Sequence, residues 1–252
     1  MNEANNLFAA LIELADDHLV LGHRLSEWCG HAPTLEEDLA LPNLALDLLG
    51  TARQLYASAG EIEGLGRDED QLAYHRDERE FRNCLLVEQP NGDFAFTVLR
   101  QFYFSAFMKE YWRQATASAN VLIRGIAGRA ANEASYHTRY ASEWTIRLGD
   151  GTDESRARMH AAIEDLHRYT GELFASSEAV RSCEKANLLP WRATMRDEWT
   201  KTSKRVFSEA RLSYPECEFF LAGGRQGKHG ECLGHMLAEM QYLQRSYPGA
   251  NW

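Results

Sequence analysis

Acidic side chains and one histidine occur at positions where they could bind metal ions. Asp17, Asp47, Glu110 and Glu133 are spread over separate amphipathic segments, and His137 follows Glu133 by four residues. In helical bundles, a carboxylate from each of two helices and a Glu-x-x-His pair from each of the other two bind a pair of iron ions. Residues three or four apart share a helix face, so a Glu and a His at that spacing can bind one ion together. The chemistry to test is therefore that of a carboxylate-bridged di-iron centre.

The histidines do not complete such a centre. Asp47 is followed at i+3 by Gly50, and Glu133 is followed at i+3 by Tyr136. His137 lies at i+4 from Glu133, which still shares a helix face and allows a contact to a single ion. Because two imidazoles are missing, we predict that the chain binds no metal ion, and that Glu133, His137 and the facing acids form a buried, hydrogen-bonded or ion-paired cluster. The degenerate ligand positions are Asp17, Asp47, Gly50, Glu110, Glu133, Tyr136 and His137.

Other chemical motifs are weaker still. The chain has one true Glu-x-x-His sequence, Glu164 to His167, and it has no counterpart elsewhere. His18 is isolated in an apolar stripe and is predicted to be a core histidine. The sequence contains no Gly-x-Ser-x-Gly, no P-loop and no Gly-x-Gly-x-x-Gly motif, which argues against nucleophilic catalysis and nucleotide binding.

The candidate residues lie on segments with helical periodicity. From Leu7 to Trp28, apolar residues and His18 recur every three or four positions, as in a helix packed inside a bundle. Gly30 and Pro33 end this segment. The further predicted helices are a short one capped by Thr34 with Glu37, one from Pro42 to Gly60, one or two short ones within 61–90, one capped by Asp93, one from Ile123 to Gly149, one from Thr152 to about Ala175, one from Pro190 to Leu212, and a last amphipathic one carrying Leu233, Met236, Leu237, Met240 and Leu243.

Long helices joined by short loops and one crossover indicate an all-α fold. The chain has 6 prolines, and none lies between Pro90 and Pro190, which favours long uninterrupted helices. No linker or repeat divides the sequence. We therefore predict a ferritin-like helical bundle with additional helices, formed by residues 1–252 as a single domain.

Composition excludes several classes of protein. With 44% apolar and 25% charged residues the chain is an ordinary globular protein. The formal charge of −10 and the absence of a basic run argue against binding to nucleic acid or to a membrane surface. The N-terminus lacks the features of a signal peptide, and no apolar run is long enough to span a bilayer. Five scattered cysteines fit a reducing compartment, so a cytoplasmic location is expected.

Four stretches of the sequence resemble a known family. They are ADDHLVLGHRLSEWCGHAP, ALPNLALDLLGTARQLY, NEASYHTRYASEWTIRLGDGTDES and the ending GGRQGKHGECLGHMLAEMQYLQRSYPGANW. Together they are similar to the C subunits of bacterial phenylacetyl-CoA epoxidases, multicomponent oxygenases of aromatic degradation. The similarity runs over essentially the whole chain, and blocks of this length are far more specific than any short motif.

The resemblance implies a ferritin-like subunit that binds a catalytic A subunit of related fold. In that family the A subunit holds the di-iron centre and epoxidises the aromatic ring of phenylacetyl-CoA, whereas the C subunit is described as non-catalytic. It further implies that this chain binds no cofactor itself and contacts other subunits of the complex. The substrate follows from the resemblance alone. A homodimer of the isolated chain is left open.

Two segments are candidates for contacts with the partner or the substrate. Arg225, Lys228 and His229 lie among glycines, and cations in a glycine-rich loop can hold a phosphate such as one from coenzyme A. The alternative is a solvated loop that caps the following helix. In that helix, Met236, Met240 and Leu243 could pack on another chain or close the core of this one.

Three functional hypotheses follow. The first is a structural, non-catalytic subunit that stabilises a di-iron partner, which the missing imidazoles favour. The second is a ferritin-like, carboxylate-bridged oxygenase active in its own right, with an unusual site built from Asp17, Asp47, Glu110, Glu133 and His137. The third is a stand-alone helical scaffold or storage protein. Iron in the isolated chain would favour the second hypothesis, and co-purification with an iron-bearing chain would count against the third.

Overall fold

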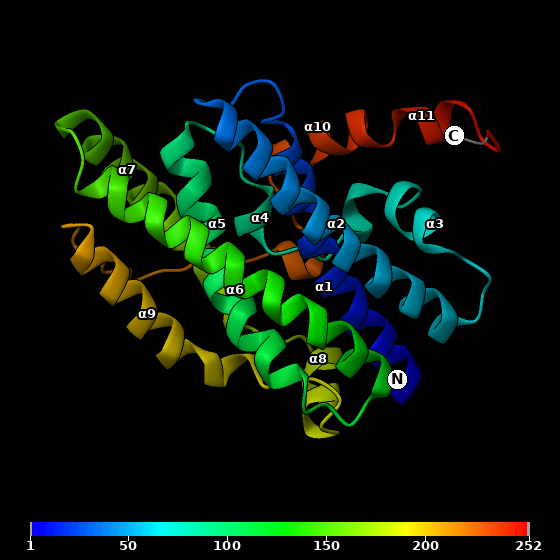
Figure 1. Cartoon of the computed structure of the whole chain (residues 1–252). Helices are drawn as coiled ribbons and strands as arrows, with labels where there is room; N and C mark the ends of the chain where they lie inside the picture. Colours follow the sequence, from blue (N-terminus) through cyan, green and yellow to red (C-terminus); the bar gives the residue numbers. More distant parts are fainter. Residues whose placement is uncertain (1, 251–252) are drawn as a thin grey trace.

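The computed structural model describes residues 2–250, which form helices and connecting loops without a strand (Figure 1). The all-α prediction is confirmed. The α-helices are α1 (Glu3–Ser26), α2 (Leu35–Glu63), α3 (Glu69–Tyr74), α4 (Leu85–Glu88), α5 (Phe94–Ala115), α6 (Val121–Gly149), α7 (Asp153–Leu166), α8 (Glu178–Lys185), α9 (Arg196–Glu209), α10 (Glu231–Met240) and α11 (Tyr242–Ser246). The 3-10 helices are η1 (Glu78–Glu80), η2 (His167–Phe174), η3 (Arg192–Met195) and η4 (Gly224–Gln226).

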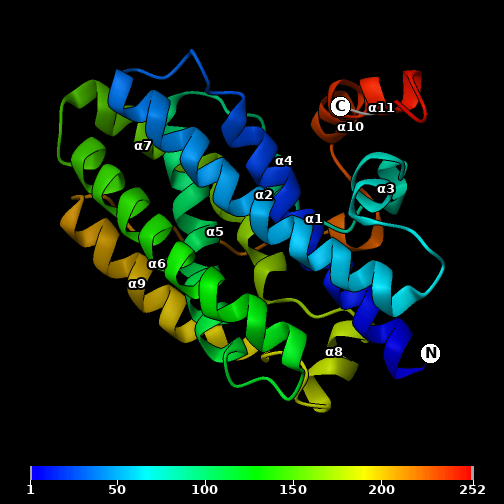
Figure 2. The ribbon, with the colours of Figure 1, turned by 45° about the vertical axis from the view of Figure 1, so that its right-hand side comes forward.

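Two helical hairpins form the centre of the molecule. Helix α1 packs along α2, α5 packs along α6, and α2 also contacts α6. Figures 1 and 2 show α2 and α6 on one side of this bundle, with α7 and α9 beside α6. Four long helices in two hairpins, joined by a crossover between α2 and α5, are consistent with the predicted ferritin-like bundle with additional helices.

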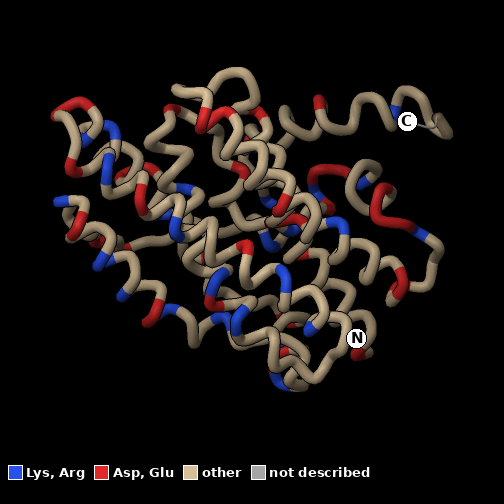
Figure 3. The backbone as a smooth tube through the Cα atoms, in the orientation of Figure 1, with Lys and Arg blue, Asp and Glu red and all other residues tan. Residues whose placement is uncertain are grey.

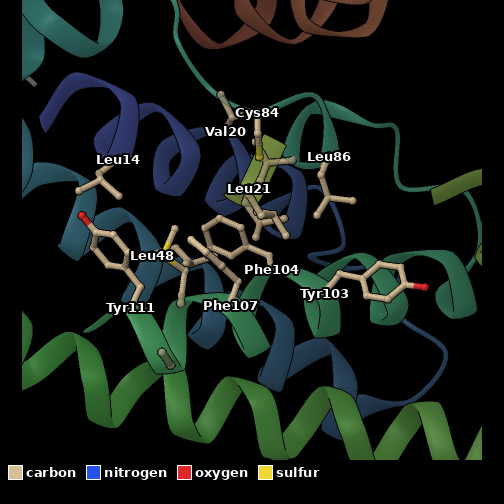
Figure 4. Packing of buried hydrophobic residues seen from close by; sticks show 14 of the residues in the cluster. Leu14, Val20, Leu21, Leu48, Cys84, Leu86, Tyr103, Phe104, Phe107 and Tyr111 are labelled. Carbon is tan, nitrogen blue, oxygen red and sulfur yellow. The ribbon is translucent and has the colours of Figure 1, made fainter. Parts of the chain in front are cut away.

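Helix α5 supplies most of the aromatic core. Its side chains are buried on nearly every side, as expected for a helix that is apolar all round. Figure 4 shows Phe104, Phe107 and Tyr111 of α5 in one cluster with Leu14 of α1 and Leu48 of α2. Aromatic side chains of this size bury large areas, so α5 holds the two hairpins together.

Predicted capping residues begin three of the long helices. The side chains of Thr34, Asp93 and Thr152 accept hydrogen bonds from backbone N–H groups in the first turns of α2, α5 and α7, at 3.4, 2.9 and 3.1 Å. Each bond satisfies a donor that the helix itself leaves free. The sequence therefore placed these helix starts correctly.

The predicted division of α2 is wrong. The sequence indicated a short helix after Thr34 and a new helix at Pro42, but α2 is continuous and Pro42 lies inside it. The helix also passes Gly60 and ends at Glu63, where Gly64 adopts a left-handed conformation. Burial of apolar residues on both sides of Pro42, such as Leu41 and Leu44, outweighs the cost of one lost hydrogen bond.

Three further boundaries differ from the prediction. The α-helical part of the fifth long helix ends at Leu166, and η2 continues to Phe174 instead. Gly171 lies there against Phe220, because an added Cβ would come within 2.6 Å of the Phe220 side chain. Helix α8 was not predicted, and the C-terminal helix is divided at Gln241. These boundaries depend on tertiary contacts rather than on local sequence.

The crossover and the C-terminal segment lie on the side of α1 that faces away from α5. Helices α3 and α4 belong to the crossover, and Figure 2 shows α10 and α11 beyond α3, at the edge of the molecule. Figure 3 shows acidic and basic residues alternating along α7 and α9. The surface of these two helices is therefore neither mainly positive nor mainly negative. In residues 2–250, no helix combines the length and the apolar character that a bilayer span requires.

We predict that Pro42→Ala stabilises the protein. The substitution restores one backbone donor inside α2 and removes the steric conflict with the preceding turn, whereas the gain in unfolded-state entropy is smaller. The free energy of unfolding in urea should rise by about 1–2 kcal/mol. Gln54→Ala, at an exposed position of α2, is the control and should change it by less than about 0.5 kcal/mol. A loss of stability with Pro42→Ala would contradict this interpretation of α2.

Candidate functional site

A small cavity lies between the four long helices, where a bundle of this type would hold its metal ions. It has room for about one water molecule. Apolar side chains fill most of the remaining space. The lining residues are His18 from α1, Asp47, Leu48 and Thr51 from α2, Phe104, Ser105, Met108 and Trp112 from α5, and Ala130, Glu133, Ala134 and His137 from α6.

On α6, Ala130, Glu133, Ala134 and His137 line the cavity, whereas Tyr136 is 45% exposed on the outside. Of the Glu133–Tyr136 pair considered from the sequence, only Glu133 therefore faces the cavity. The imidazole of α6 that faces it is His137, four residues after Glu133.

The cavity-facing pairs at i, i+3 on the other helices lack a ligand set. On α2 this pair is Leu48 and Thr51, and on α5 it is Ser105 and Met108. Gly50 lies outside the cavity lining, and a Cβ at its position would lie nearest to the guanidinium of Arg129. A di-iron centre needs several carboxylates to neutralise two cations. The cavity residues do not fit such a pair of ions.

Asp47 and Glu133 have protein partners at the rim of the cavity. The Nε2 atom of His137 lies 3.1 Å from Oδ2 of Asp47. Glu133 binds Arg129 of its own helix and accepts a 3.4 Å hydrogen bond from the hydroxyl of Thr51. The result is a cluster of two adjacent contacts, in which Glu133 binds an exposed arginine and Thr51 while His137 binds Asp47.

Glu110 and Asp17 do not join this cluster. Glu110 binds Arg113 and Gln114 on the surface of α5, and the hydrogen bond from Arg113 lowers the pKa of its carboxyl. Asp17 lies on the other side of α1 and binds Arg225. The structure thus brings Asp47, Glu133 and His137 together and separates them from the other two acids. Within residues 2–250, no group of three or more His, Cys, Asp or Glu side chains has a geometry that could hold a metal ion.

His18 contributes an uncharged imidazole to the cavity wall. It is buried, its Nδ1 atom lies 2.7 Å from the carbonyl oxygen of Leu14, and Phe104 and Trp112 pack against its ring. Burial lowers its pKa to about 4, despite the opposing effect of the Leu14 carbonyl. The short Nδ1–oxygen distance fits a neutral ring that donates from Nδ1.

The opposite side of α1 carries a row of buried ion pairs. Three carboxylates, those of Glu13, Asp16 and Asp17, each bind an arginine from a distant segment of the chain. Glu13 lies 2.8 Å from Nη1 of Arg192, and Asp17 lies 2.7 Å from Nη2 of Arg225. Asp16 binds Arg76 and the hydroxyl of Tyr56, and it accepts a 2.7 Å hydrogen bond from the backbone N–H of Arg82.

Arg225 is part of this row rather than an exposed anion site. Burial on its own would lower its pKa, but Asp17 and Glu13 outweigh this effect and the pKa is raised. The guanidinium also donates to the backbone carbonyls of Glu13 and Arg82, at 3.3 and 2.8 Å. Glu172 accepts a 2.9 Å hydrogen bond from the backbone N–H of Gly223 and so fixes the loop that presents Arg225.

His229 also points inward. Its Nδ1 atom lies 2.7 Å from Oε2 of Glu88, and the carboxylate of Glu88 accepts a further bond from the backbone N–H of Gly230. Burial opposes its charge, but the bond with Glu88 outweighs this and its pKa is raised. Of the three cations proposed to hold a phosphate, only Lys228 is exposed. A phosphate contact by all three would require two buried pairs to separate.

The remaining candidates have structural surroundings. His167 is buried, its Nδ1 atom lies 3.2 Å from the hydroxyl of Tyr103, and burial lowers its pKa to about 4. Glu164, its partner in the sequence motif, is exposed. In the C-terminal helices, Met236 is buried in this chain's own core, Met240 is half-buried and Leu243 is exposed.

Sequence reasoning missed most of the ion pairs. Residues 7–21 are almost continuously apolar, so charged residues within them must be buried and paired. That signal pointed to Glu13, Asp16 and Asp17. It could not identify their partners, because Arg76, Arg192 and Arg225 lie far away in the sequence. The other members of the network that were missed are Tyr56, Glu88 and Glu172.

Four long helices packed in two hairpins around a small central cavity define a protein of ferritin-like type. A family model described as "Phenylacetic acid catabolic protein" matches residues 1–252, and the chain belongs to this family. The chain is also similar to the C subunit of the 1,2-phenylacetyl-CoA epoxidase of Escherichia coli (strain K12). The two are 46% identical over 248 residues, which are 98% of this chain and 100% of that protein. The family resemblance drawn from the sequence is confirmed.

We predict that Arg225→Met destabilises the protein strongly. The substitution leaves the buried carboxylate of Asp17 without its counter-charge, which should lower the free energy of unfolding by about 3–5 kcal/mol. Lys228→Met in the same loop is the matched control, because Lys228 is exposed. It should change the free energy by less than about 0.5 kcal/mol in urea titrations. Equal effects of the two substitutions would contradict the role given to Arg225.

We also predict that His18 makes stability fall in acid. The unfolded state binds a proton near pH 6.5 and the folded state only near pH 4, so stability is lost as the pH falls between these values. The loss from one such histidine is about 1.4 kcal/mol per pH unit. His18→Leu should therefore reduce the loss between pH 7 and pH 5 by about 2 kcal/mol in urea titrations. His160→Leu, at an exposed position, should leave the loss unchanged, and an unchanged loss in His18→Leu would refute the assignment.

Proposed function

We propose that this chain is a structural, non-catalytic subunit of a multicomponent di-iron oxygenase that epoxidises the aromatic ring of phenylacetyl-CoA. In this role it binds and stabilises the catalytic A subunit. The observation that carries the proposal is the composition of the cavity between the long helices. The cavity is lined by two carboxylates and two imidazoles, but Asp47 is paired with His137 and Glu133 with Arg129. In residues 2–250, no group of three or more His, Cys, Asp or Glu side chains is arranged to hold a metal ion.

The comparisons support the assignment to an assembly. The relative of similar length is a subunit of an epoxidase, and the two sequences align over nearly their full lengths. A subunit that lacks ligands needs a second chain to supply the metal site. We infer that the A subunit holds the di-iron centre and that this chain binds no cofactor.

The ion pairs on α1 suit a stabilising role. They join the crossover, the loop between α8 and α9, and the C-terminal segment to one helix, so that distant parts of the chain keep a fixed arrangement. Removing one partner of a buried pair costs several kcal/mol, which makes these contacts sensitive to substitution. A fixed surface is what a partner subunit needs for docking with little loss of conformational entropy.

A second candidate function is oxygenation by this chain itself. One observation favours it, because Asp47, Glu133 and His137 lie at the rim of the same cavity as His18. Against it, Glu133 is bound by Arg129 and Asp47 by His137, and no group of three or more ligating side chains in the part of the chain that the structure describes is arranged to hold a metal ion. The non-catalytic role is therefore the better supported function.

Iron analysis of separated chains tests the proposal. The chain is expressed alone and together with the A subunit from the same source, and the iron bound to each purified sample is measured. We expect far less than one iron per isolated chain, and iron in the co-expressed complex at the level that the A subunit binds. His137→Ala should leave the iron content and the turnover of the complex unchanged, because no metal depends on it. Stoichiometric iron in the isolated chain that His137→Ala removes would establish the second candidate instead.

A further inference from the structure

The outer face of α2 carries an apolar stripe that the chain itself does not cover. Leu35, Leu39 and Leu46 are 71%, 61% and 65% exposed, and Pro42 and Leu49 between and beyond them are half-buried. The spacings along the stripe are four, three, four and three residues. Figure 2 shows α2 across the front of the molecule with no other helix in front of it.

This spacing is that of a seam between two helices. Apolar residues that alternate three and four apart form the contact line along which a second helix packs by inserting side chains between them. Single exposed leucines are common on protein surfaces, but three on one line of one helix form a contiguous patch. The cavity-facing residues Leu48 and Thr51 lie on a different side of α2. Within the stripe Leu49 packs beside Gly22 of α1, whereas the three exposed leucines leave an apolar surface uncovered.

The length and surroundings of the stripe fit the centre of an interface. From Leu35 to Leu49 it extends over roughly 21 Å at 1.5 Å per residue. Polar or small residues lie beside or beyond the stripe, namely the exposed Asn43 and Gln54 and the half-buried Gly50. An apolar centre with a polar rim is typical of protein interfaces. A stable interface buries about 800 Å² on each partner, more than one helix face supplies, so neighbouring surfaces would add to the contact.

We propose that an α-helix of the A subunit of the epoxidase packs on this stripe, which makes the outer face of α2 the docking surface of the chain. The inference rests on the proposed function, because it assumes an assembly with a second kind of subunit. Glu36 and Asp38 flank the stripe at its first turn, so the docked helix is expected to carry basic residues there. A second copy of this chain fits less well, because it brings another net charge of −10.

Paired charge substitutions test the docking surface. Leu39→Glu with Leu46→Glu places two carboxylates in the seam while leaving this chain's core unchanged, because both side chains are exposed. Affinity for the purified A subunit, measured by calorimetry, should fall at least about 100-fold. Leu65→Glu, at a 74% exposed position in the loop that follows α2, is the matched control and should bind as the original chain does. Leu46→Met, which conserves apolar volume, should also retain binding.

The outcomes separate this inference from the proposed function. If the unaltered chain does not bind the A subunit, the proposed function fails. If it binds and the double substitution binds equally well, the α2 surface is wrong while the function stands. If the double substitution abolishes a homodimer of the isolated chain but leaves the affinity for the A subunit intact, the occupant is a second copy and the proposal is overturned. Circular dichroism and thermal unfolding of each variant show whether a loss of binding comes from a loss of folding.

Discussion

The structure depends on three carboxylates that point from one side of α1 into the protein and bind arginines. Each ion pair joins α1 to a segment far away in the sequence, so a single helix organises the crossover, the connection after α8 and the C-terminal loop. Buried charges are costly without partners, and here further hydrogen bonds from backbone N–H groups satisfy the carboxylates of Asp16 and Asp17. The pairs are Glu13 with Arg192, Asp16 with Arg76, and Asp17 with Arg225.

The two sides of α1 have different roles in the structure. One side contributes His18 to a cavity that holds about one water, and the other side carries the ion pairs. The carboxylates that line the cavity, Asp47 and Glu133, are paired with His137 and Arg129, and aromatic side chains from α5 occupy much of the space. This composition supports the proposed role in assembly rather than in catalysis.

The sequence predicted the fold class and most helix starts, because these depend on local periodicity and capping. It failed where tertiary packing decides the outcome. Pro42 did not interrupt α2, since the helix is held on both sides by buried residues. The sequence placed Glu133 and His137 on one helix face, and both line the cavity, but it could not show that Glu133 is bound by Arg129. Arg225 was a candidate for a phosphate contact, and its buried pairing with Asp17 could not be predicted because the two residues are 208 positions apart.

The central claim is that the interior of this chain cannot hold a pair of metal ions. The most direct test is anomalous X-ray diffraction at the iron absorption edge from crystals of the complex with the A subunit. The account predicts iron peaks within the partner and none between α1, α2, α5 and α6 of this chain. A pair of peaks beside His137 in this bundle would contradict it.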